Sequence, residues 1–402
     1  MTSIRGVTQK MDEKMETKAA PEKVAVKAKT FVCANCGGVI KFDIDSQKFR
    51  CASCKTESAI ETLSEQVREY DFSGYLAREK ASVAFEGVAV IHCQNCGCEI
   101  TFEAAQIAAT CPMCGSSQVA TVKQSAGIPP EGIIPFTVDK DEAALQFKKW
   151  VKSRWFAPGD FKKKCSGGAL KGMFLPFWTY DAKSIADYTG RGGHTRTEKD
   201  KDGNVRTVTD WFPVSGIVTE DFDDVLVCAS GKGKALNGIL PYKTVTDTKP
   251  YSPSYLSGFY AELYTVKADA GFETAKGIMQ DSLRAAARQE ILSRFDSAEV
   301  SNLDAKYTDV TYKHLLLPVW GSAYGYKGKA YNYFVNGETG KVDGQRPYSV
   351  PKIVAAVLVT LAVAAGVALL LHFSHGPQKP ADIPAAVLTQ ETQVFMFTAD
   401  HM

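Results

Sequence analysis

The sequence predicts an α+β protein with two small zinc ribbons, a β-rich α+β domain and one C-terminal transmembrane helix. Three observations support this prediction: two cysteine frames of identical spacing, a long central stretch rich in β-branched and aromatic residues with turns marked by glycine, and an uncharged apolar run near the C-terminus. The chain of 402 residues has 45% hydrophobic and 23% charged residues, which is typical of folded protein and long enough for two or three domains.

The predicted segments follow from changes in composition along the chain. In order they are a disordered segment (1–30), zinc ribbon 1 (31–58), a partly helical connector (59–90), zinc ribbon 2 (91–120), a Pro/Gly linker (121–136), the β-rich domain (137–350), the transmembrane helix (353–373) and a short tail (374–402). Residues 1–30 contain no apolar h-region, so we expect no secretory signal peptide.

The two cysteine frames predict metal sites. Their ligands are Cys33, Cys36, Cys51 and Cys54 in the first frame, and Cys93, Cys96, Cys111 and Cys114 in the second. Two CxxC turns supply the four thiolates of a structural zinc site, which leaves no open coordination position for catalysis. We therefore expect two structural Zn²⁺ sites. Iron in a rubredoxin-like site and redox-active CxxC pairs stay open as alternatives.

Charge decides what the ribbons are expected to bind. Residues 91–120 contain no Lys or Arg, and a site with four thiolates adds a nominal charge of about −2. Nucleic-acid affinity depends on basic side chains that neutralise phosphates, and the net charge of the whole chain is only +2. Nucleic acid is therefore an unexpected partner, and protein partners are favoured. Cys98 lies outside the frame and is interpreted as a bystander thiol, with ligand exchange as the alternative.

Two helices and a β-hairpin are expected in the β-rich domain. Asp139 is the predicted N-cap of a helix whose apolar face carries Ala143, Phe147, Trp150, Val151 and Trp155. A second helix at roughly 273–294 presents Ile278, Met279, Leu283, Ala286, Ala287 and Ile291. Residues 314–342 predict two strands that turn at residues 327–329, with a further turn at 336–337.

An internal echo suggests that this domain has two related halves. The letters FLPFW at residues 174–178 return as LLPVW at residues 316–320, and a Tyr follows each of them. Each copy could open a long strand that ends in a turn with glycine and basic residues. Coincidence is the alternative at this point.

Residues 353–373 predict a membrane span. The run IVAAVLVTLAVAAGVALLLHF has no Asp, Glu, Lys or Arg, and a helix of this length at about 1.5 Å per residue crosses the roughly 30 Å hydrocarbon core of a bilayer. Lys341, Arg346 and Lys352 precede the run, while Lys379 follows it. The positive-inside rule therefore favours a single-pass protein of the cytoplasmic (inner) membrane with a cytoplasmic N-terminus, where free thiolates also persist.

No motif in the sequence favours an enzyme. A phosphate-binding loop of the GxxxxGK[ST] type is missing. The acidic residues Glu220, Asp221, Asp223 and Asp224 could bind a divalent cation but are better interpreted as the solvated start of a strand. His194 is expected in a surface loop, and neither Cys165 nor Cys228 has a partner suited to a nucleophile.

Several stretches together resemble a bacterial family of membrane-anchored double zinc-ribbon proteins. They include PPEGIIPF, FKKWVKSRWFAPGDFK, MFLPFWTYDA, DFDDVLVCAS, YLSGFYAELYTV and the long run from YKHLLLPVWGSAYGYKG to YSVPKI. Members are often labelled as primosomal protein N-prime (replication factor Y), a helicase, or as a transcription factor IIB-type zinc ribbon protein. The resemblance implies a scaffold near SPFH-domain or phage-shock-type membrane-stress proteins. This chain shows one span where some relatives are expected to carry two.

The sequence therefore predicts a non-enzymatic, membrane-anchored zinc-ribbon adaptor that recruits protein partners at the cytoplasmic face of the membrane. A nucleic-acid-binding replication accessory and a metal-dependent enzyme in residues 137–350 are the alternatives.

Overall fold

A computed structural model describes most of the chain. The described residues are 23–25, 28–61, 66–81, 88–92, 99–102, 106–110, 116–120, 128–164, 170–199, 201, 203, 205–231, 233–262 and 264–374. The chain divides into two compact units: the first contains Met1–Arg154 and Asp160–Arg346, and the second contains Trp155–Gly159 and Pro347–Met402.

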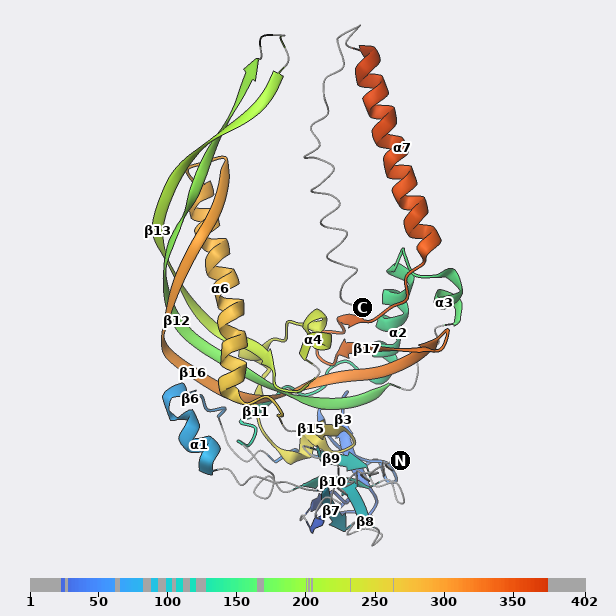
Figure 1. Ribbon diagram of the computed structural model, residues 1–402. Helices are drawn as coiled ribbons and strands as arrows, with labels where there is room; N and C mark the ends of the chain where they lie inside the picture. The colour runs from blue at the N-terminus through green and yellow to red at the C-terminus, as the bar shows by residue number, and fades with distance from the viewer. Residues whose placement is uncertain are drawn as a thin grey trace, which may run out of the picture. The chain divides into compact units, whose positions relative to one another are not determined.

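The fold is mixed α/β and rich in sheet. At the centre of the first unit lie four antiparallel strands in the order β13 (Val205–Cys228), β12 (Lys171–Lys199), β16 (Ser297–Tyr326) and β17 (Lys329–Asn336). Figure 1 shows β12, β13 and β16 running together as a long twisted ribbon with α6 (Ala268–Leu292) along it. The predicted turn after β16 is confirmed, because Lys327 and Gly328 both have positive φ angles of 48° and 77°.

The two predicted helices are present with corrections. The N-cap of α2 (Lys140–Ser153) is confirmed, because the Asp139 carboxylate accepts the Glu142 N–H at 2.7 Å. Trp155 was expected on the buried face, but the helix ends at Ser153 and Trp155 is exposed. Helix α6 begins five residues earlier than predicted, and Ile278 is also exposed.

The buried face of α6 explains the error at Ile278. Its buried residues recur every four positions, at Ala275, Met279, Leu283, Ala287 and Ile291. This stripe packs on β12 and β13, where Ala186, Tyr188 and Val218 complete one of the core clusters. A residue one position before the stripe points about 100° away from it, so it faces solvent.

The repeated motifs FLPFW and LLPVW are related by an approximate two-fold axis within the domain. Strands β12 and β16 pair antiparallel, and Leu175 of the first copy lies opposite Leu317, its equivalent in the second copy. The pairing axis therefore passes between the two copies at residues 174–178 and 316–320. The first copy begins close to the start of β12, whereas the second lies deep inside β16.

Matching contacts around the two tryptophans support the relation. The indole N–H of Trp178 donates to the Val266 carbonyl at 2.8 Å, and that of Trp320 donates to the Val138 carbonyl at 2.9 Å. Each valine lies just before a helix, α6 and α2 respectively. Each helix thus packs on the hairpin of the other half, because α6 contacts β12–β13 and α2 contacts β17.

The predicted linker belongs to the core. Ile128, Ile134 and Phe136 are buried, and β11 (Gly132–Ile133) pairs parallel with β16 and antiparallel with β14 (Lys249–Pro250). Removing the apolar side chains of this stretch from water stabilises its buried position. Residues 121–127 of the predicted linker lie outside the described residues.

The connector packs against the same domain. Strand β6 (Tyr70–Asp71) pairs with β16, and the 3₁₀ turn η1 (Phe72–Gly74) leads into α1 (Tyr75–Ala81). Tyr75 is buried, and the Phe72 ring lies 4.7 Å from that of Phe272 on α6. The partly helical character is confirmed, and the segment is one face of the core rather than a tether.

Short elements complete the first unit. They are α4 (Gly233–Leu236), η3 (Asn237–Ile239), α5 (Thr244–Asp247), η4 (Pro253–Leu256), β15 (Tyr260–Glu262), β18 (Val342–Gly344) and, apart from its first residue, α3 (Gly159–Lys164). Strand β15 pairs parallel with β12, in the place that β11 takes beside β16, and so repeats the two-fold relation.

The N-terminal strands attach to this sheet. Strands β9 (Gln106–Thr110) and β10 (Ser117–Ala120) continue it beyond β15, and β2 (Ala28–Thr30) pairs with β10. Strands β1 (Lys23–Ala25), β7 (Val88–His92) and β8 (Glu99–Phe102) form a separate sheet. Disorder was predicted for residues 1–30, but 23–25 and 28–30 are strands because backbone pairing holds them; the rest lie outside the described residues.

The second unit contains α7 (Val350–Ser374), which overlaps the predicted span at residues 353–373. Within it, Val350–Leu370 is long and apolar enough to cross a membrane, and none of it is buried. Among the described residues it is the one helix with this property.

Candidate metal centre

The four cysteines of the first frame converge on one point. Their Sγ atoms all lie within 4.8 Å of one another, with Cys33–Cys54 at 3.6 Å and Cys36–Cys51 at 3.5 Å. A tetrahedral ion with zinc–sulfur bonds of about 2.3 Å separates its sulfurs by about 3.8 Å. The geometry therefore fits a four-thiolate zinc site. Cys33 and Cys51 are buried, while Cys36 and Cys54 reach the surface.

A small three-stranded sheet positions these cysteines. Strands β3 (Ile40–Asp43) and β4 (Lys48–Cys51) form the hairpin between the two CxxC turns, and β5 (Glu57–Ser58) pairs with β4. The alternation in β4 is regular, because Phe49 and Cys51 point inward while Lys48 and Arg50 point outward. The predicted ribbon hairpin is present at residues 31–58.

The two CxxC turns have the same backbone hydrogen bonds. The Cys33 carbonyl accepts the Gly37 N–H at 2.8 Å, and the Cys51 carbonyl accepts the Lys55 N–H at 3.1 Å. Both turns end in a residue with positive φ, 70° at Gly37 and 63° at Lys55. Glycine adopts this conformation without steric cost, whereas lysine pays about 1–2 kcal/mol.

We expect Lys55→Gly to tighten zinc binding at the first site. Relief of the left-handed strain is worth about 1 kcal/mol, which corresponds to a roughly fivefold gain in apparent affinity. The matched change Gly37→Ala should weaken binding by a similar factor, because a Cβ at Gly37 meets nothing within 4 Å and only the backbone cost remains. Competition with a chromophoric chelator measures both. Equal affinities in the two variants would contradict this account of the turns.

Local hydrogen bonds prepare the thiols for a cation. The Thr56 hydroxyl and backbone N–H lower the pKa of Cys54 to about 5. The pKa of Cys51 is also lowered, first by the backbone N–H of Cys54. The pKa of Cys36 is raised to about 12: the Gly38 backbone N–H opposes the shift, but contacts with Cys54 and Cys51 outweigh it. Without metal, the low pKa of Cys54 favours a thiolate at that position, whereas Cys36 holds a proton that zinc would displace on binding.

The ribbon is fixed to the β-rich domain by its hairpin. The Phe42 ring is buried 5.4 Å from that of Tyr255, and the Phe42 N–H donates to the Ser257 carbonyl at 3.2 Å. The Ser257 hydroxyl donates back to the Ile40 carbonyl at 3.1 Å, and the Gln47 amide donates to the Phe136 carbonyl at 2.8 Å. One face of the ribbon is therefore occupied within the molecule, and the CxxC end stays accessible.

A shallow hollow lies beside Cys51 on this ribbon. Its lining includes three cationic side chains, Lys41, Arg50 and Lys55, together with the Asp43 carboxylate. This side of ribbon 1 thus carries a local cluster of positive charge. Opposing it, Asp43 lies 3.9 Å from Arg50 and accepts hydrogen bonds from Ser46.

The second frame is not placed by the structure. Cys93, Cys96, Cys111 and Cys114 lie outside the described residues, and so do Cys98 and Cys165. The flanking strands differ from those of the first ribbon, because β8 pairs with β7, while β9 pairs with β10 and β15. The second zinc site stays a prediction from spacing.

The acidic residues at 220–224 are not a uniformly solvated strand start. They lie inside β13, where Asp223 and Asp224 form a β-bulge opposite Asp181. The bulge turns Asp224 inward, so its side chain is 3% exposed and lies 2.7 Å from the ammonium of Lys313. The expectation of a solvated cluster is therefore wrong for Asp224.

A lysine of the chain itself neutralises part of this acidic cluster. The carboxylates of Asp181, Asp223 and Asp224 are close enough to hold a metal ion. However, Lys313 is ion-paired both to Asp224 and to Glu69 of the connector, each at 2.7 Å. Sequence reasoning missed Lys313 and Glu69. The sequence did contain a signal for Lys313: it is a single lysine shortly before the apolar run LLLPVW, at a position that an alternating strand would bury.

The Asp181 carboxylate forms no ion pair with a described lysine or arginine side chain. It accepts the Asp224 backbone N–H at 2.7 Å and the Thr311 hydroxyl at 2.9 Å. Burial, opposed by the Asp224 N–H and reinforced by the negative charge of Glu69, raises the pKa of Asp181 to about 6. A carboxyl pKa raised by folding stabilises the protein only at low pH, and this contribution is lost as the pH rises through 6.

We therefore expect Asp181→Asn to raise the melting temperature at about pH 7.5 and to leave it nearly unchanged at about pH 4. The amide oxygen can still accept the Asp224 N–H, the amide N–H can donate to the Thr311 hydroxyl oxygen, and the amide cannot ionise. Thermal melts across this pH range measure the difference. A variant destabilised equally at both values would show that the Asp181 carboxylate is needed in its charged form.

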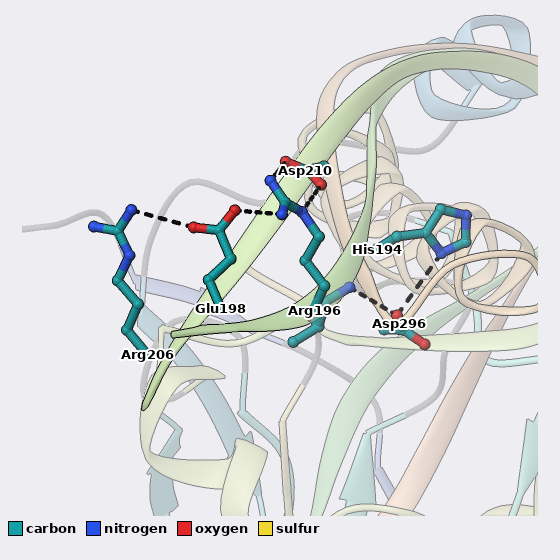
Figure 2. A network of polar contacts seen from close by, with 7 residues as sticks. His194, Arg196, Glu198, Arg206, Asp210 and Asp296 are labelled. Carbon is teal, nitrogen blue, oxygen red and sulfur yellow. Dashed lines mark hydrogen bonds and ion pairs between the residues drawn. The ribbon is translucent and has the colours of Figure 1, made fainter. Parts of the chain in front are cut away.

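His194 lies in strand β12 rather than in the expected surface loop. Figure 2 shows it beside Asp296, with Nδ1 3.7 Å from that carboxylate, next to a ladder in which Arg196 pairs with Asp210 and with Glu198. These side chains are about half exposed, and such pairs contribute at most about 1 kcal/mol. The network is suited to holding the hairpin strands in register, not to catalysis. Cys228 lies at the end of β13, half-buried beside Ser230.

Comparison with known proteins gives one informative similarity. No protein-family model and no solved structure matches the chain. The uncharacterised protein YdjG of Bacillus subtilis (strain 168) is 29% identical over 329 residues, which cover 81% of this chain and 92% of that protein. The similarity extends over most of both chains, so it includes more than the short cysteine frames.

Proposed function

We propose that the protein is a non-enzymatic, membrane-anchored zinc-ribbon adaptor that recruits protein partners at the cytoplasmic face of a bacterial inner membrane. The observation that carries the proposal is the closed four-cysteine centre on a folded β-rich domain whose chain continues into the apolar helix α7. Four thiolates leave a bound zinc ion no position for substrate, so the ion holds a surface in shape.

Because ribbon 1 packs on the β-rich domain, only part of its surface is available for recruiting partners. The Phe42 face of ribbon 1 packs on the domain, which leaves its CxxC end for partners. We include the second ribbon as a recruiting element because of its charge, although its strand β9 also pairs with β15 of the domain. The second ribbon has no Lys or Arg, so it suits a partner with a cationic or neutral surface. SPFH-domain or phage-shock-type membrane proteins are the partners that the family resemblance implies.

Partner capture from membranes tests the adaptor role. The full chain, carrying an affinity tag, is purified in detergent and its companions are quantified, with Cys93→Ser/Cys96→Ser compared against Cys98→Ser. We expect the double variant to lose companions that the Cys98 variant retains, because only the former removes predicted zinc ligands. If both variants retain the same companions, the second ribbon is not the recruiting element.

The two alternatives have their own readouts. A replication accessory would require binding of DNA by the full chain that weakens steeply with salt. The hollow with Lys41, Arg50 and Lys55 is where such binding would be sought. A metal-dependent enzyme would require an ion among Asp181, Asp223 and Asp224, where Lys313 already pairs with Asp224. We therefore do not offer that cluster as a catalytic centre.

A further inference from the structure

A segment from the middle of the chain is attached to the start of α7. The ammonium of Lys352 donates to the carbonyls of Trp155 at 3.3 Å and Ala157 at 2.8 Å, and the Ser349 N–H donates to the Phe156 carbonyl at 2.8 Å. Almost 200 residues separate these partners in sequence. Three successive carbonyls of residues 155–157 are thus held beside the first turn of the helix.

We call these contacts between residues 155–157 and residues 349–352 the clip. Several side chains in and beside the clip face solvent. Trp155 is 75% exposed and Phe156 40%, while just before and at the start of α7 Tyr348 is 50% and Val350 69% exposed. Isolated apolar side chains on a surface are ordinary, but two aromatic residues in succession with a third beside the start of an apolar helix form a patch. Water is a poor solvent for such a patch.

The chemistry of the patch matches the boundary of a bilayer. Trp and Tyr rings favour the level of the lipid headgroups at the ends of membrane spans, and a lysine there places its ammonium among the phosphates. The flanking sequence is basic, with Asp160 as its single acidic residue between 148 and 164. Its basic residues are Lys148, Lys149, Lys152, Arg154, Lys162, Lys163 and Lys164. Each basic residue near an anionic leaflet adds about 1 kcal/mol of attraction.

We propose that Trp155, Phe156 and Tyr348 form a second membrane contact, which lies in the headgroup region of an anionic bilayer beside α7. The contact gives residues 155–159 a membrane-facing role, although they lie between two elements of the β-rich domain in sequence. This inference rests on the membrane anchoring in the proposed function and is independent of partner recruitment.

Fluorescence of Trp155 in lipid nanodiscs tests the contact. The full chain is incorporated into nanodiscs of phosphatidylcholine and phosphatidylglycerol whose acyl chains are brominated near the headgroup. The emission of Trp155→Phe is subtracted from that of the wild type to isolate Trp155 among the five tryptophans. We expect bromolipid to quench roughly half or more of this difference signal and aqueous iodide to quench little of it.

Each other outcome has a definite meaning. Quenching by iodide but not by bromolipid overturns the proposal, because Trp155 would then lie in water. Quenching by neither also overturns it and indicates burial against a second copy of the chain. Failure of the chain to enter nanodiscs at all would instead contradict the membrane anchoring of the proposed function.

Lipid composition tests the electrostatic part. Replacing the phosphatidylglycerol with phosphatidylcholine should reduce the bromolipid quenching, because the lysines lose their anionic partners. Unchanged quenching would overturn the role of anionic headgroups. The variant Lys352→Met keeps the rings but removes the two ammonium contacts to the Trp155 and Ala157 carbonyls. Its Trp155 signal should shift to longer wavelength and become accessible to iodide; an unshifted signal would show that Lys352 does not position the ring.

Discussion

Replacing Cys51 with serine is expected to release the zinc ion of the first frame and to unfold ribbon 1. Cys51 is fully buried, and its sulfur lies 3.5 Å from that of Cys36. A module of fewer than about 40 residues depends on its metal, and zinc-finger peptides gain roughly 10–16 kcal/mol of folding free energy from zinc. No other substitution considered for this chain has a larger expected effect.

The measurement has two parts. Zinc content should fall by about one ion per chain, and hydrogen exchange should lose its protection across residues 31–58. Most of the β-rich domain should stay protected, because the core clusters around Trp178, Phe177 and Leu283 include no ribbon residue. Protection should fall only locally around Tyr255, whose ring contacts that of Phe42. Cys228→Ser is the matched control and should keep all zinc. Full zinc content in the Cys51 variant would contradict the four-thiolate centre.

Replacing Lys313 with methionine is expected to destabilise the β-rich domain by about 3–5 kcal/mol. Methionine has a similar length but carries no charge, so Asp224 would remain buried, with only 3% of its side chain exposed, without its ammonium partner. Glu69 would lose the ion pair that joins the connector to β16. Chemical denaturation at neutral pH measures the loss.

Two comparisons separate this explanation from a general effect of removing lysine. Lys183→Met removes an ion pair with Asp309 in which both side chains are about two-thirds exposed, and it should cost less than about 1 kcal/mol. Adding Asp224→Asn to Lys313→Met should restore much of the lost stability, because no unpaired buried charge remains. A double variant no more stable than the single one would contradict the buried-charge account.

Local patterns were sufficient for part of the fold and part of the site. The first cysteine frame, the Asp139 cap and the apolar helix at 353–373 were all predicted in the right places. In each case the decisive information lies within a few residues or in one continuous run. The same reasoning failed at Trp155 and Ile278, because a periodic pattern does not show where a helix stops or which of two adjacent apolar residues faces the core.

Long-range contacts explain the other differences. Residues 128–136 look like a linker by their prolines and glycines, but β16 and β14 cover both edges of β11 and bury the isoleucines. Equally, FLPFW and LLPVW suggest a repeat without showing that the two copies pair with each other across a two-fold axis. Pairing partners of this kind lie more than a hundred residues apart in sequence.

The sequence by itself determined the first four-cysteine cluster that could hold a metal, the membrane-spanning candidate and the β-rich character of the domain, because spacing, length and composition act over short distances. Only the tertiary structure decided that Lys313 neutralises Asp224, that Phe42 fixes the first ribbon to the domain, and that Lys352 holds residues 155–157. These contacts depend on which distant surfaces meet. Burial makes these contacts necessary, because a charged group removed from water is stable only beside a group that neutralises it, and the fold decides which group that is.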